Sequence, residues 1–526
     1  MSTSGPMSSS STPKSDERPV IAIGESPLTL PEFLALASGA ARPIIDPGAE
    51  CRWRIERSAA VLEAVIATDA RVYGVTTGVG ESVLNSLSQE AADSLPLNLL
   101  RFHGCGVGEI LGETESAAVL VARLASLARG YGGVRIEVLE RLCTLLDRRI
   151  LPRIPSQGSV GASGDLTPLS YVAAVLVGER EVSYGGQVMP ATQALEAEEL
   201  QPLRLLPKES LALMNGTSVM TALGALAWSR AQRLGRFVAA LTAGASDVMG
   251  GNPGHFAERI FALKPYPGLV TAGRWIREDV EQERRIDFRP ERLQDRYSIR
   301  CAPHVIGVLL DSAAAARAIL EVEINSINDN PIIDPYSETI LHGGNFYGGH
   351  VGYALDGLKT AVANIADLVD RQLVLLCDPA VNGGLPANLV GAPESERTAH
   401  HGFKAVSIAA SALTAEALKL TMPASAFSRS TESHNQDKVP MATIAARDCL
   451  KILEMTETIA SMAALAVCQA VDLRQGEGCQ ARALALRESI RRHVPMVTAD
   501  RRMDLDIAVV SALAAAHELP IGDVDA

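Results

Sequence analysis

Aromatic side chains are scarce in this chain, because Phe, Trp and Tyr together make up 4% of its 526 residues. Alanine and leucine take their place, and the apolar content still reaches 47%. Aromatic residues favour strands whereas alanine and leucine favour helices, so this composition predicts a mainly α-helical fold. The apolar content is also high enough for a sizeable buried core.

Long apolar runs and paired cysteines are missing too. No run reaches the roughly 18–20 apolar residues of a membrane span, and the longest candidate, IASMAALAVCQAV at 459–471, is shorter. The eight cysteines include no Cys-x-x-Cys pair, so reduced core cysteines of a cytoplasmic protein are expected rather than a disulfide framework. Residues 1–19 lack an apolar signal-peptide core and are expected to form a disordered leader.

Positive charge is in deficit, and the charges are dispersed. The chain has 48 Lys and Arg against 61 Asp and Glu, which gives a net charge of -13. Such a chain has no basic patch for a nucleic acid, and an anionic membrane surface would repel it. We therefore expect no nucleic-acid partner and no membrane association.

Several common catalytic motifs are absent as well. The nucleophile elbow G-x-S-x-G needs a glycine two residues after the serine, but the segment GASGD has Asp165 there. The glycines of YGVTTGVG (73–80) fit neither G-x-G-x-x-G nor a Walker loop. His400 and His401 are adjacent, so on a helix they would point apart, and no His-x-x-x-His pair occurs. Neither a metal nor a nucleotide cofactor is predicted.

The loops and the long apolar segments divide the chain into two parts. Residues 20–205 mix short helices with glycine-rich loops, whereas residues 206–526 hold long segments rich in alanine and leucine. We therefore expect a smaller N-terminal loop-rich helical domain, which carries the GASGD segment, and a long-helix bundle after it. No strand-helix alternation supports a parallel sheet.

Two bundle helices can be placed in advance. One begins near Pro303, a residue favoured at the first helical position, and is expected to stop at Asn330-Pro331. The other occupies 403–420, where apolar residues recur at steps of three and four, as on the buried seam of a helix. That seam consists of Phe403, Val406, Ala410, Leu413, Ala417 and Leu420.

Seven polar islands interrupt the apolar surroundings. They are YGVTTGVG, GASGD, ALMNGTSVM, QDRYSIR, NSINDNP, HGGNF and TESHNQD. Unpaired polar side chains are costly to bury, so such islands bind one another or a ligand. Taken together they resemble the aromatic amino-acid ammonia-lyase and aminomutase family, which includes the histidine, phenylalanine and tyrosine ammonia-lyases. The resemblance extends over roughly residues 20–520.

Ser163 lies among glycines and small residues, and by itself it fits a nucleophile, a phosphate cradle or a plain turn. The resemblance implies another role. In this family the backbone of such a triplet, here Ala162, Ser163 and Gly164, cyclises with loss of two waters to 4-methylidene-imidazol-5-one (MIO). Glycine suits the attacking amide because its nitrogen is unhindered and it tolerates a compressed turn. The MIO electrophile forms without an external cofactor or metal and makes the substrate's amine a better leaving group.

The resemblance also implies roles for other islands. Tyr73, in a loop with three glycines, matches the base that takes the substrate's β-proton under a mobile lid. Asn215 matches the amide that polarises the MIO carbonyl, and Tyr297 matches a second tyrosine near the electrophile. Arg300 matches the clamp on the substrate carboxylate, and Asn345 matches a further carboxylate partner.

A substrate pocket is implied around these groups. Glu432 matches a carboxylate near the substrate's amine, and Phe346 would lie against the ring. Lys404 fits a pocket-lining position and fits a surface lysine equally well. The other expected lining residues are Phe102, His103, Gln294, Asn435 and Gln436.

The ring-facing residues favour one substrate. Phe102 offers an apolar wall, His103 offers a hydrogen-bond partner for a phenol, and Gln436 lacks the charge that would suit an imidazole. We expect elimination of ammonia from L-tyrosine to give trans-p-coumarate, then from L-phenylalanine to give trans-cinnamate, with L-histidine and urocanate third. An MIO-dependent 2,3-aminomutase shares every residue named and stays open. A catalytically inactive helical assembly protein is the remaining alternative, and the intact triplet argues against it.

The resemblance finally implies a homotetramer whose active sites are shared between subunits. Long helices whose apolar stripes exceed the core of one chain agree with this, because such stripes must be buried against partners. Three residues depart from the family pattern. They are His304, where glutamine is expected, Pro440, where serine is common, and Asn328, where threonine or serine is usual.

Overall fold

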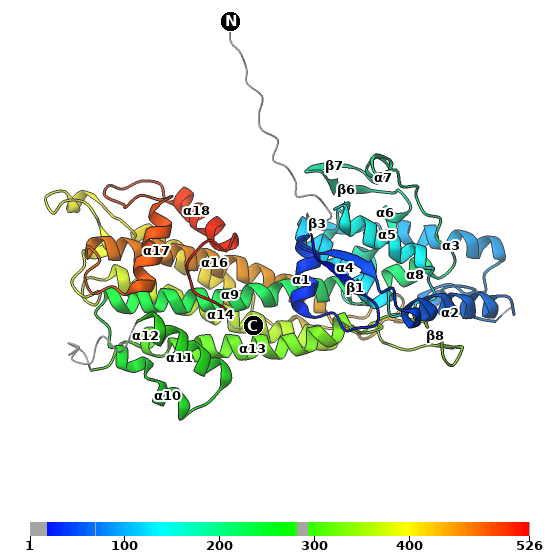
Figure 1. The fold of residues 1–526 in the computed structure, drawn as a ribbon, viewed down its shortest axis with the longest axis horizontal. Helices are drawn as coiled ribbons and strands as arrows, with labels where there is room; N and C mark the ends of the chain where they lie inside the picture. Colours follow the sequence, from blue (N-terminus) through cyan, green and yellow to red (C-terminus); the bar gives the residue numbers. More distant parts are fainter. Residues whose placement is uncertain (1–17, 69, 281–292, 525–526) are drawn as a thin grey trace, which may run out of the picture. The chain divides into compact units, whose positions relative to one another are not determined.

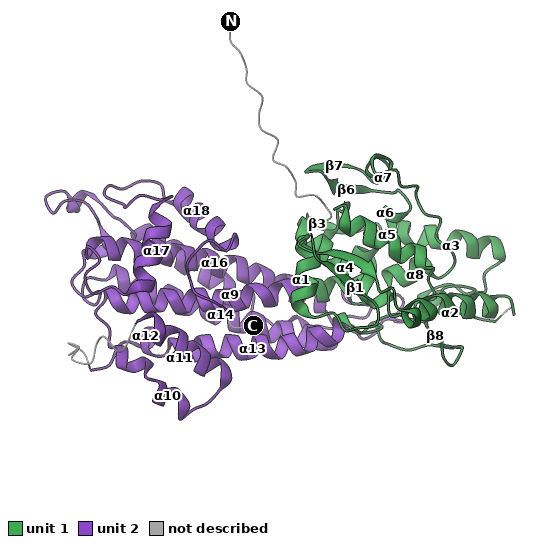
Figure 2. Cartoon of the chain, in the orientation of Figure 1, with its two compact units in different colours: residues 1–158, 163–222, 324–347 green, residues 159–162, 223–323, 348–526 purple. Residues whose placement is uncertain are grey.

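The computed structural model describes residues 18–68, 70–280 and 293–524, which form two compact units (Figure 2). Unit 1 takes the described residues of Met1–Gly158, Ser163–Ala222 and Ile324–Tyr347, and unit 2 takes those of Ser159–Ala162, Leu223–Glu323 and Gly348–Ala526. Most of the expected leader, residues 1–17, lies outside the described residues. The expected division into domains at residue 205 stays a prediction.

Long helices dominate unit 2 and confirm the expected mainly α-helical fold (Figure 1). α14 packs along α16, and α15 packs against both. The long helices are α9 (Ser218–Val248), which begins in unit 1, α13 (Ala302–Ile324), α14 (Gly349–Cys377) and α16 (Ala442–Leu473). The shorter α-helices are α10 (Glu258–Ala262), α11 (Pro267–Asp279), α12 (Tyr297–Arg300), α15 (Lys404–Lys419), α17 (Ala481–Arg491) and α18 (Asp504–Ala515). Short 3-10 turns occupy Pro253–Phe256, Ala387–Leu389, Arg397–Ala399 and Ala424–Ala426.

Glycines let α9 approach its neighbours closely. A Cβ atom on Gly244 would lie 2.8 Å from Cγ1 of Val467 on α16, and one on Gly224 would lie 2.9 Å from Cδ2 of Leu320 on α13. Real Cβ contacts are longer than this, so a larger residue at either position would push the helices apart. At Gly224 and Gly244 the absence of a side chain therefore allows α9 to pack closely against α13 and α16.

The expected seam of residues 403–420 is largely confirmed. Phe403, Val406, Ala410 and Ala417 are buried, while Leu413 and Leu420 of that seam are half-buried. Thr414 is buried beside Leu413, because its hydroxyl donates to Ala410 O at 2.9 Å and so needs no water.

One helical segment among the described residues, Arg397–Ala426, is long and apolar enough by composition to span a membrane, with 22% of its apolar window buried. The core helix of a soluble protein can have the same length and composition, so these two properties are weak evidence for a membrane span.

The helix expected from Pro303 to Asn330 ends earlier than predicted. α13 ends at Ile324, because the next side chain, Asn325, takes partners outside the helix. Asn325 Oδ1 accepts from Leu28 N at 2.7 Å, and its Nδ2 donates to Leu28 O at 2.9 Å. The residues that follow therefore form a loop before the Asn330-Pro331 bond, which is cis.

Unit 1 combines short helices with small sheets around the buried helix α4, in which every residue from Ser116 to Leu127 is buried. β1 and β2 are parallel, and β3 with β5, β4 with β6 and β7, and β8 with β9 are antiparallel. The helices are α1 (Leu30–Ser38), α2 (Ala49–Ile66), α3 (Gln89–Phe102), α4 (Glu113–Leu127), α5 (Ile136–Asp147), α6 (Leu166–Leu176), α7 (Ala191–Ala197) and α8 (Glu209–Met214), with a 3-10 turn at Gly80–Leu84. The strands are β1 (Val20–Ile23), β2 (Arg42–Ile45), β3 (Val107–Ile110), β4 (Leu151–Pro152), β5 (Pro155–Gln157), β6 (Glu181–Tyr184), β7 (Gln187–Pro190), β8 (Ile332–Asp334) and β9 (Thr339–Leu341).

Candidate active site

A tight turn holds the Ala-Ser-Gly triplet against the segment NGTS. Ser163 and Gly164 both have positive φ, 50° and 78°. Gly216 N donates to Ser163 O at 3.2 Å, and Asp165 N donates to Gly216 O at 2.8 Å. A Cβ atom on Gly164 would come within 2.1 Å of Gly216 O, so only glycine fits at position 164.

The carboxylate of Asp165 lies at the beginning of α9. It is fully buried, and its Oδ2 accepts from Val219 N at 3.0 Å and from Met220 N at 2.9 Å. Amide groups in the first turn of a helix have no partner within the helix, and the helix dipole favours a negative charge there. The residue after the triplet is thereby attached to the first turn of a 31-residue helix.

Asn215 lies between α8 and α9, one residue before the glycine that pairs with the triplet. Its backbone O accepts from Arg123 Nη1 at 2.8 Å, and its Nδ2 donates to Asn330 O at 3.4 Å. Its Oδ1 is buried with no hydrogen-bond partner among the described residues, and so is the hydroxyl of Ser218. Buried polar atoms rarely stay unpaired, so the compressed turn and these two atoms fit a polar group that forms from the triplet and completes their hydrogen bonds.

Two buried cations lie near this turn. Lys208 Nζ pairs with Asp329 Oδ2 at 2.6 Å, and both side chains are almost completely buried. Burial lowers the pKa of Lys208, and the attraction of Asp329 opposes that shift. Burial also lowers the pKa of Arg123 to about 10, which still leaves the guanidinium charged at neutral pH. The surroundings of Asn215 are therefore suited to an oxygen that carries partial negative charge.

Tyr73 is half-buried in the loop before Gly80. Its phenol oxygen accepts from Gly80 N at 2.8 Å, which closes the loop on itself. Val72 and Val75 on either side belong to a small hydrophobic core with α2 and β8. A Cβ atom on Gly74 would come within 2.5 Å of Leu211 Cδ2, so the loop also lies directly against α8, the helix that leads to Asn215.

Phe102 and His103 end α3 with their rings 4.0 Å apart. Phe102 is 59% exposed, and His103 is half-buried. Burial, with a smaller contribution from the charge of Arg180, lowers the pKa of His103 to about 4. The imidazole is therefore uncharged at neutral pH and can act as one donor and one acceptor.

Arg180 holds this turn in place, and the sequence interpretation missed it. Its guanidinium donates to Leu100 O and, at 3.0 Å, to the hydroxyl of Ser170 on α6, which in turn donates to His103 O at 3.2 Å. A Cβ atom on Gly104 would meet Arg180 Nη2 at 2.6 Å. The glycine after His103 was the only local signal, and nothing in the sequence links it to a residue 76 positions later.

In unit 2, Tyr297 and Arg300 form the short helix α12. The guanidinium of Arg300 lies over the Tyr297 ring at 4.6 Å, and its Nε donates to Asp295 O at 3.0 Å. Tyr297 is 71% exposed, and Gln294 is exposed as well. A single chain thus presents a phenol and a guanidinium together on the surface of its unit 2.

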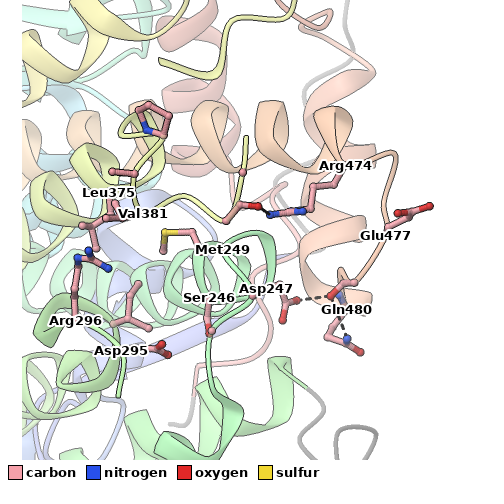
Figure 3. Close-up of a pocket in the computed structure, with 18 residues that line it drawn as sticks. Ser246, Asp247, Met249, Asp295, Arg296, Leu375, Val381, Arg474, Glu477 and Gln480 are labelled. Carbon is pink, nitrogen blue, oxygen red and sulfur yellow. Dashed lines mark hydrogen bonds between the residues drawn. The ribbon is translucent and has the colours of Figure 1, made fainter. Parts of the chain in front are cut away.

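A cavity of about 980 Å³ lies next to α12 in unit 2 (Figure 3). Asp295, Arg296 and Ile299 contribute to its wall, together with Asp247 at the end of α9 and Arg474 after α16. None of the predicted site residues lines this cavity, although Gln294, Tyr297 and Arg300 are its neighbours in sequence. This cavity is therefore not the predicted substrate pocket.

Glu432, Asn435 and Gln436 share a turn between α15 and α16. Three successive residues from Glu432 have positive φ, and Asn435 N donates to Glu432 O at 2.9 Å. The hydroxyl of Thr431 donates to Gln436 Oε1 at 2.9 Å, so the amide of Gln436 is fixed from within the turn. The side chains of Glu432 and Asn435 are exposed.

The remaining predicted residues lie in exposed segments. Asn345 Nδ2 donates to Ile327 O at 3.2 Å, Phe346 is half-buried, and Lys404 is exposed at the first turn of α15. Among the departures from the family pattern, Pro440 lies against Gly161, where a Cβ atom would meet its Cγ at 2.7 Å. Asn328 Oδ1 accepts from the hydroxyl of Ser126, and His304 Nδ1 has no partner within the described chain.

Contacts within unit 1 bring several of the polar islands together. GASGD pairs with NGTS, and NSINDNP contacts both NGTS through Asn330 and HGGNF through the bond from Gly343 N to Asn330 Oδ1 at 2.9 Å. QDRYSIR, which includes α12, and TESHNQD, which lies in the loop between α15 and α16, both belong to unit 2. In the described ranges no group of three or more His, Cys, Asp or Glu side chains is arranged to hold a metal ion.

Comparison with known proteins assigns the family. A model of the aromatic amino acid lyase family matches residues 28–492. The histidine ammonia-lyase of Bacillus velezensis is 36% identical over 468 residues, which cover 89% of this chain and 90% of that protein. The tyrosine ammonia-lyase of Cereibacter sphaeroides is 37% identical over 504 residues, which cover 92% of this chain and 95% of that protein.

The fold agrees with solved structures of related enzymes. The tyrosine aminomutase from Streptomyces globisporus superposes with a TM-score of 0.87 at 33% identity, over 96% of this chain and all of that one. The histidine ammonia-lyase from Trypanosoma cruzi gives a TM-score of 0.85 at 29% identity, over 94% of this chain and 93% of that one. With family model, relatives and fold in agreement, the chain belongs to the aromatic amino acid lyase family and is a carbon–nitrogen lyase.

Proposed function

We propose that this enzyme is an aromatic L-amino-acid ammonia-lyase that uses an MIO group formed from Ala162, Ser163 and Gly164. The observation that carries the proposal is the turn in which Gly164 lies against Gly216 with no room for a side chain. Such a compressed turn favours attack of the Gly164 amide nitrogen on the carbonyl carbon of Ala162. The cyclisation of the triplet releases two waters. Once formed, the group supplies an electrophile for the substrate's amine.

The reaction converts L-tyrosine to trans-p-coumarate and ammonium. The Cα–N bond and one Cβ–H bond break, the electron pair of the Cβ–H bond forms the double bond, and the proton ends on ammonium. Tyr73 is proposed to take the β-proton, because Gly80 N donates to the phenol oxygen that must carry negative charge when its own proton leaves. The loop around Tyr73 would exclude water while the charge develops.

Arg300 is proposed to bind the substrate carboxylate, with Asn345 as a second partner. Nε of Arg300 is already used by Asp295 O, so the two terminal nitrogens remain to form a fork on a carboxylate. The face of Tyr297 lies against the same guanidinium and limits its rotation. Asn215, whose Oδ1 lacks a partner, is proposed to orient the group formed at the triplet.

The ring of the substrate is proposed to lie against Phe102 and His103. An uncharged His103 can hydrogen-bond a phenol, and Phe102 gives an exposed apolar surface, which supports tyrosine first and phenylalanine second. Gln436 is neutral and is held by Thr431, so it offers no charge to an imidazolium. Histidine is the second candidate substrate, because several curated relatives carry the name histidine ammonia-lyase. A 2,3-aminomutase uses the same groups and is distinguished by its β-amino acid product.

The active form is proposed to be a cytoplasmic homotetramer with composite active sites. The proposed carboxylate clamp and base are exposed or half-buried in one chain, and Tyr297 is 71% exposed. Large apolar side chains on the helices of unit 2, such as Tyr353 on α14 and Ile408 on α15, are exposed as well. Subunit contacts would bury them and would bring Tyr297 and Arg300 to a triplet of another chain.

Replacing the serine of the triplet tests the proposed group directly. The wild-type chain should weigh two waters less than its sequence in intact-mass spectrometry. Ser163→Ala should have the full mass of its sequence and nearly no lyase activity, because no hydroxyl is left to eliminate. An unmodified wild-type mass, or full activity of Ser163→Ala, would contradict the proposal. Ser38→Ala at the end of α1 is the matched control, since that serine is exposed and lies outside the triplet.

A three-substrate assay tests the ring recognition. A neutral hydrogen bond contributes about 0.5–1.5 kcal/mol, so kcat/KM for tyrosine should exceed that for phenylalanine by about 2- to 13-fold. His103→Leu should remove this preference. The preference should not vary with pH between about 5 and 8, because the pKa of His103 is about 4 and its imidazole gains no proton there. Faster turnover of histidine than of tyrosine would show that the ring assignment is wrong.

Arg180→Gln tests whether Arg180 influences the pKa of His103 and, through it, the preference for tyrosine. Removal of the charge should raise the pKa of His103 in an NMR titration towards its usual value, while burial, the larger cause, still keeps it below that value. The tyrosine preference should then vary as the pH falls through the raised pKa. Arg101→Gln, which breaks the neighbouring exposed pair with Glu179, should change neither quantity. An unchanged His103 pKa in Arg180→Gln would exclude the positioning role.

Mixed tetramers test the shared active sites. Tyr73→Phe and Ser163→Ala chains should each be inactive, but their co-expression should restore part of the activity, because some sites then combine an intact Tyr73 with an intact triplet. The measurement is the specific activity of tetramers in which both variants are verified by mass. If such tetramers stay inactive, each site is built within one chain.

A further inference from the structure

A second cavity of unit 2 lies outside every group discussed above. It has a volume of about 440 Å³ and is walled by α9, by α16 and by the chain from α18 to Ile521. α18 packs on α16, as Figure 1 shows, and the residues after it complete the wall. Volumes of about 300–1,000 Å³ are usual for small-molecule sites, so the cavity is large enough for a ligand with a single ring.

The cavity contains an arginine whose guanidinium is not bonded to a carboxylate. Arg233 on α9 is half-buried, and in the described part of the chain its guanidinium makes no hydrogen bond or ion pair. Two acids, Glu454 and Glu457, also line the cavity. Both oxygens of Glu457 accept from Arg230, at 3.0 and 2.6 Å, and Glu454 pairs with Lys451 at 2.9 Å. His517 adds no negative charge, and burial and Arg233 both lower its pKa. An arginine in this situation offers its planar donors to an anion.

The walls of the cavity specify the rest of the ligand. Leu234 and Phe237 on α9 and Leu519 and Ile521 in the C-terminal segment are all buried apolar residues. A ligand that reaches Arg233 therefore also contacts apolar side chains on two sides. The carboxylate of Glu457 on the same wall disfavours a doubly charged anion such as phosphate.

We propose that this cavity is a second ligand site, which binds a monocarboxylate with an apolar body. The carboxylate pairs with the guanidinium of Arg233, and the body lies between Phe237 and Ile521. The site goes beyond the proposed function and does not depend on it, since none of its residues belongs to the proposed active site. A bound ligand bridges α9 and the segment after α18, so it would also stabilise the C-terminal part of the chain.

Calorimetric titration of the intact enzyme with 3-phenylpropanoate tests the site. This monocarboxylate has an apolar ring and no amine, so it is not a substrate for elimination. We expect two classes of binding site per chain. Arg233→Gln should weaken one class by about 10-fold or more, because a hydrogen-bonded charge is lost, while Arg233→Lys should retain part of the affinity. Arg492→Gln, which removes an exposed arginine of the same unit outside the cavity, should keep both classes.

Two further arms make the result specific. Arg300→Gln should weaken only the other class. If Arg300→Gln keeps both classes unchanged, the proposed active site is contradicted while the proposal for this cavity stands. Acetate, which has no apolar body, should bind the Arg233 class about 10-fold more weakly than 3-phenylpropanoate. Binding of the same stoichiometry and affinity to wild type and Arg233→Gln would overturn the proposal. Equal affinity for acetate and inorganic phosphate would also overturn it, because the cavity would then select only charge.

Discussion

The carboxylate of Asp165 is the contact on which the proposed chemistry depends. This carboxylate accepts from Val219 N and Met220 N and so attaches Asp165 to the first turn of α9. The backbone amide of Asp165 donates to Gly216 O. These bonds join two segments that lie more than 50 residues apart in the chain, and they flank Ser163 and Gly164, which both have positive φ. Strain of this kind is costly, and it persists only where the surroundings over-determine it. Here the surroundings are the buried contact of the Asp165 carboxylate with α9 and the close approach of Gly216 to Gly164.

The turn proposed to recognise the substrate is linked to the same segment. α6 begins directly after Asp165, and one of its faces carries Ser170, whose hydroxyl bonds to His103 O. Arg180, beyond the end of α6, closes the clamp on the turn of α3. The first turn of α6, a helix of 11 residues, therefore lies between the triplet and the contact to the turn proposed to face the ring. A rigid helix is a better spacer than a loop, so secondary structure rather than flexible side chains would set the distance between the proposed electrophile and the proposed ring wall.

The sequence allowed the helical fold, the 403–420 helix and the family to be predicted, because each rests on local periodicity or on short motifs. The predicted end of α13 was wrong, because the side chain of Asn325 bonds to Leu28, almost 300 residues away in the chain. No local sequence pattern carries that information. For the same reason Arg180 was missed, and so was the approach of Gly216 to Gly164. The triplet itself could be identified because it belongs to the set of short motifs that resemble the family. The roles of the residues in unit 2 stay predictions, because the proposed composite site includes residues of other subunits. The sequence of one chain does not say where those subunits lie.

The central claim is that the attachment of Asp165 to α9 compresses the triplet for cyclisation, and the intact mass of Asp165→Ala tests it most directly. The variant would be purified as a folded species by size exclusion, with helix content checked by circular dichroism. We expect most folded chains to have the full mass of their sequence, because a turn released from α9 no longer brings the Gly164 amide to the preceding backbone. A complete two-water deficit in folded Asp165→Ala would contradict the account.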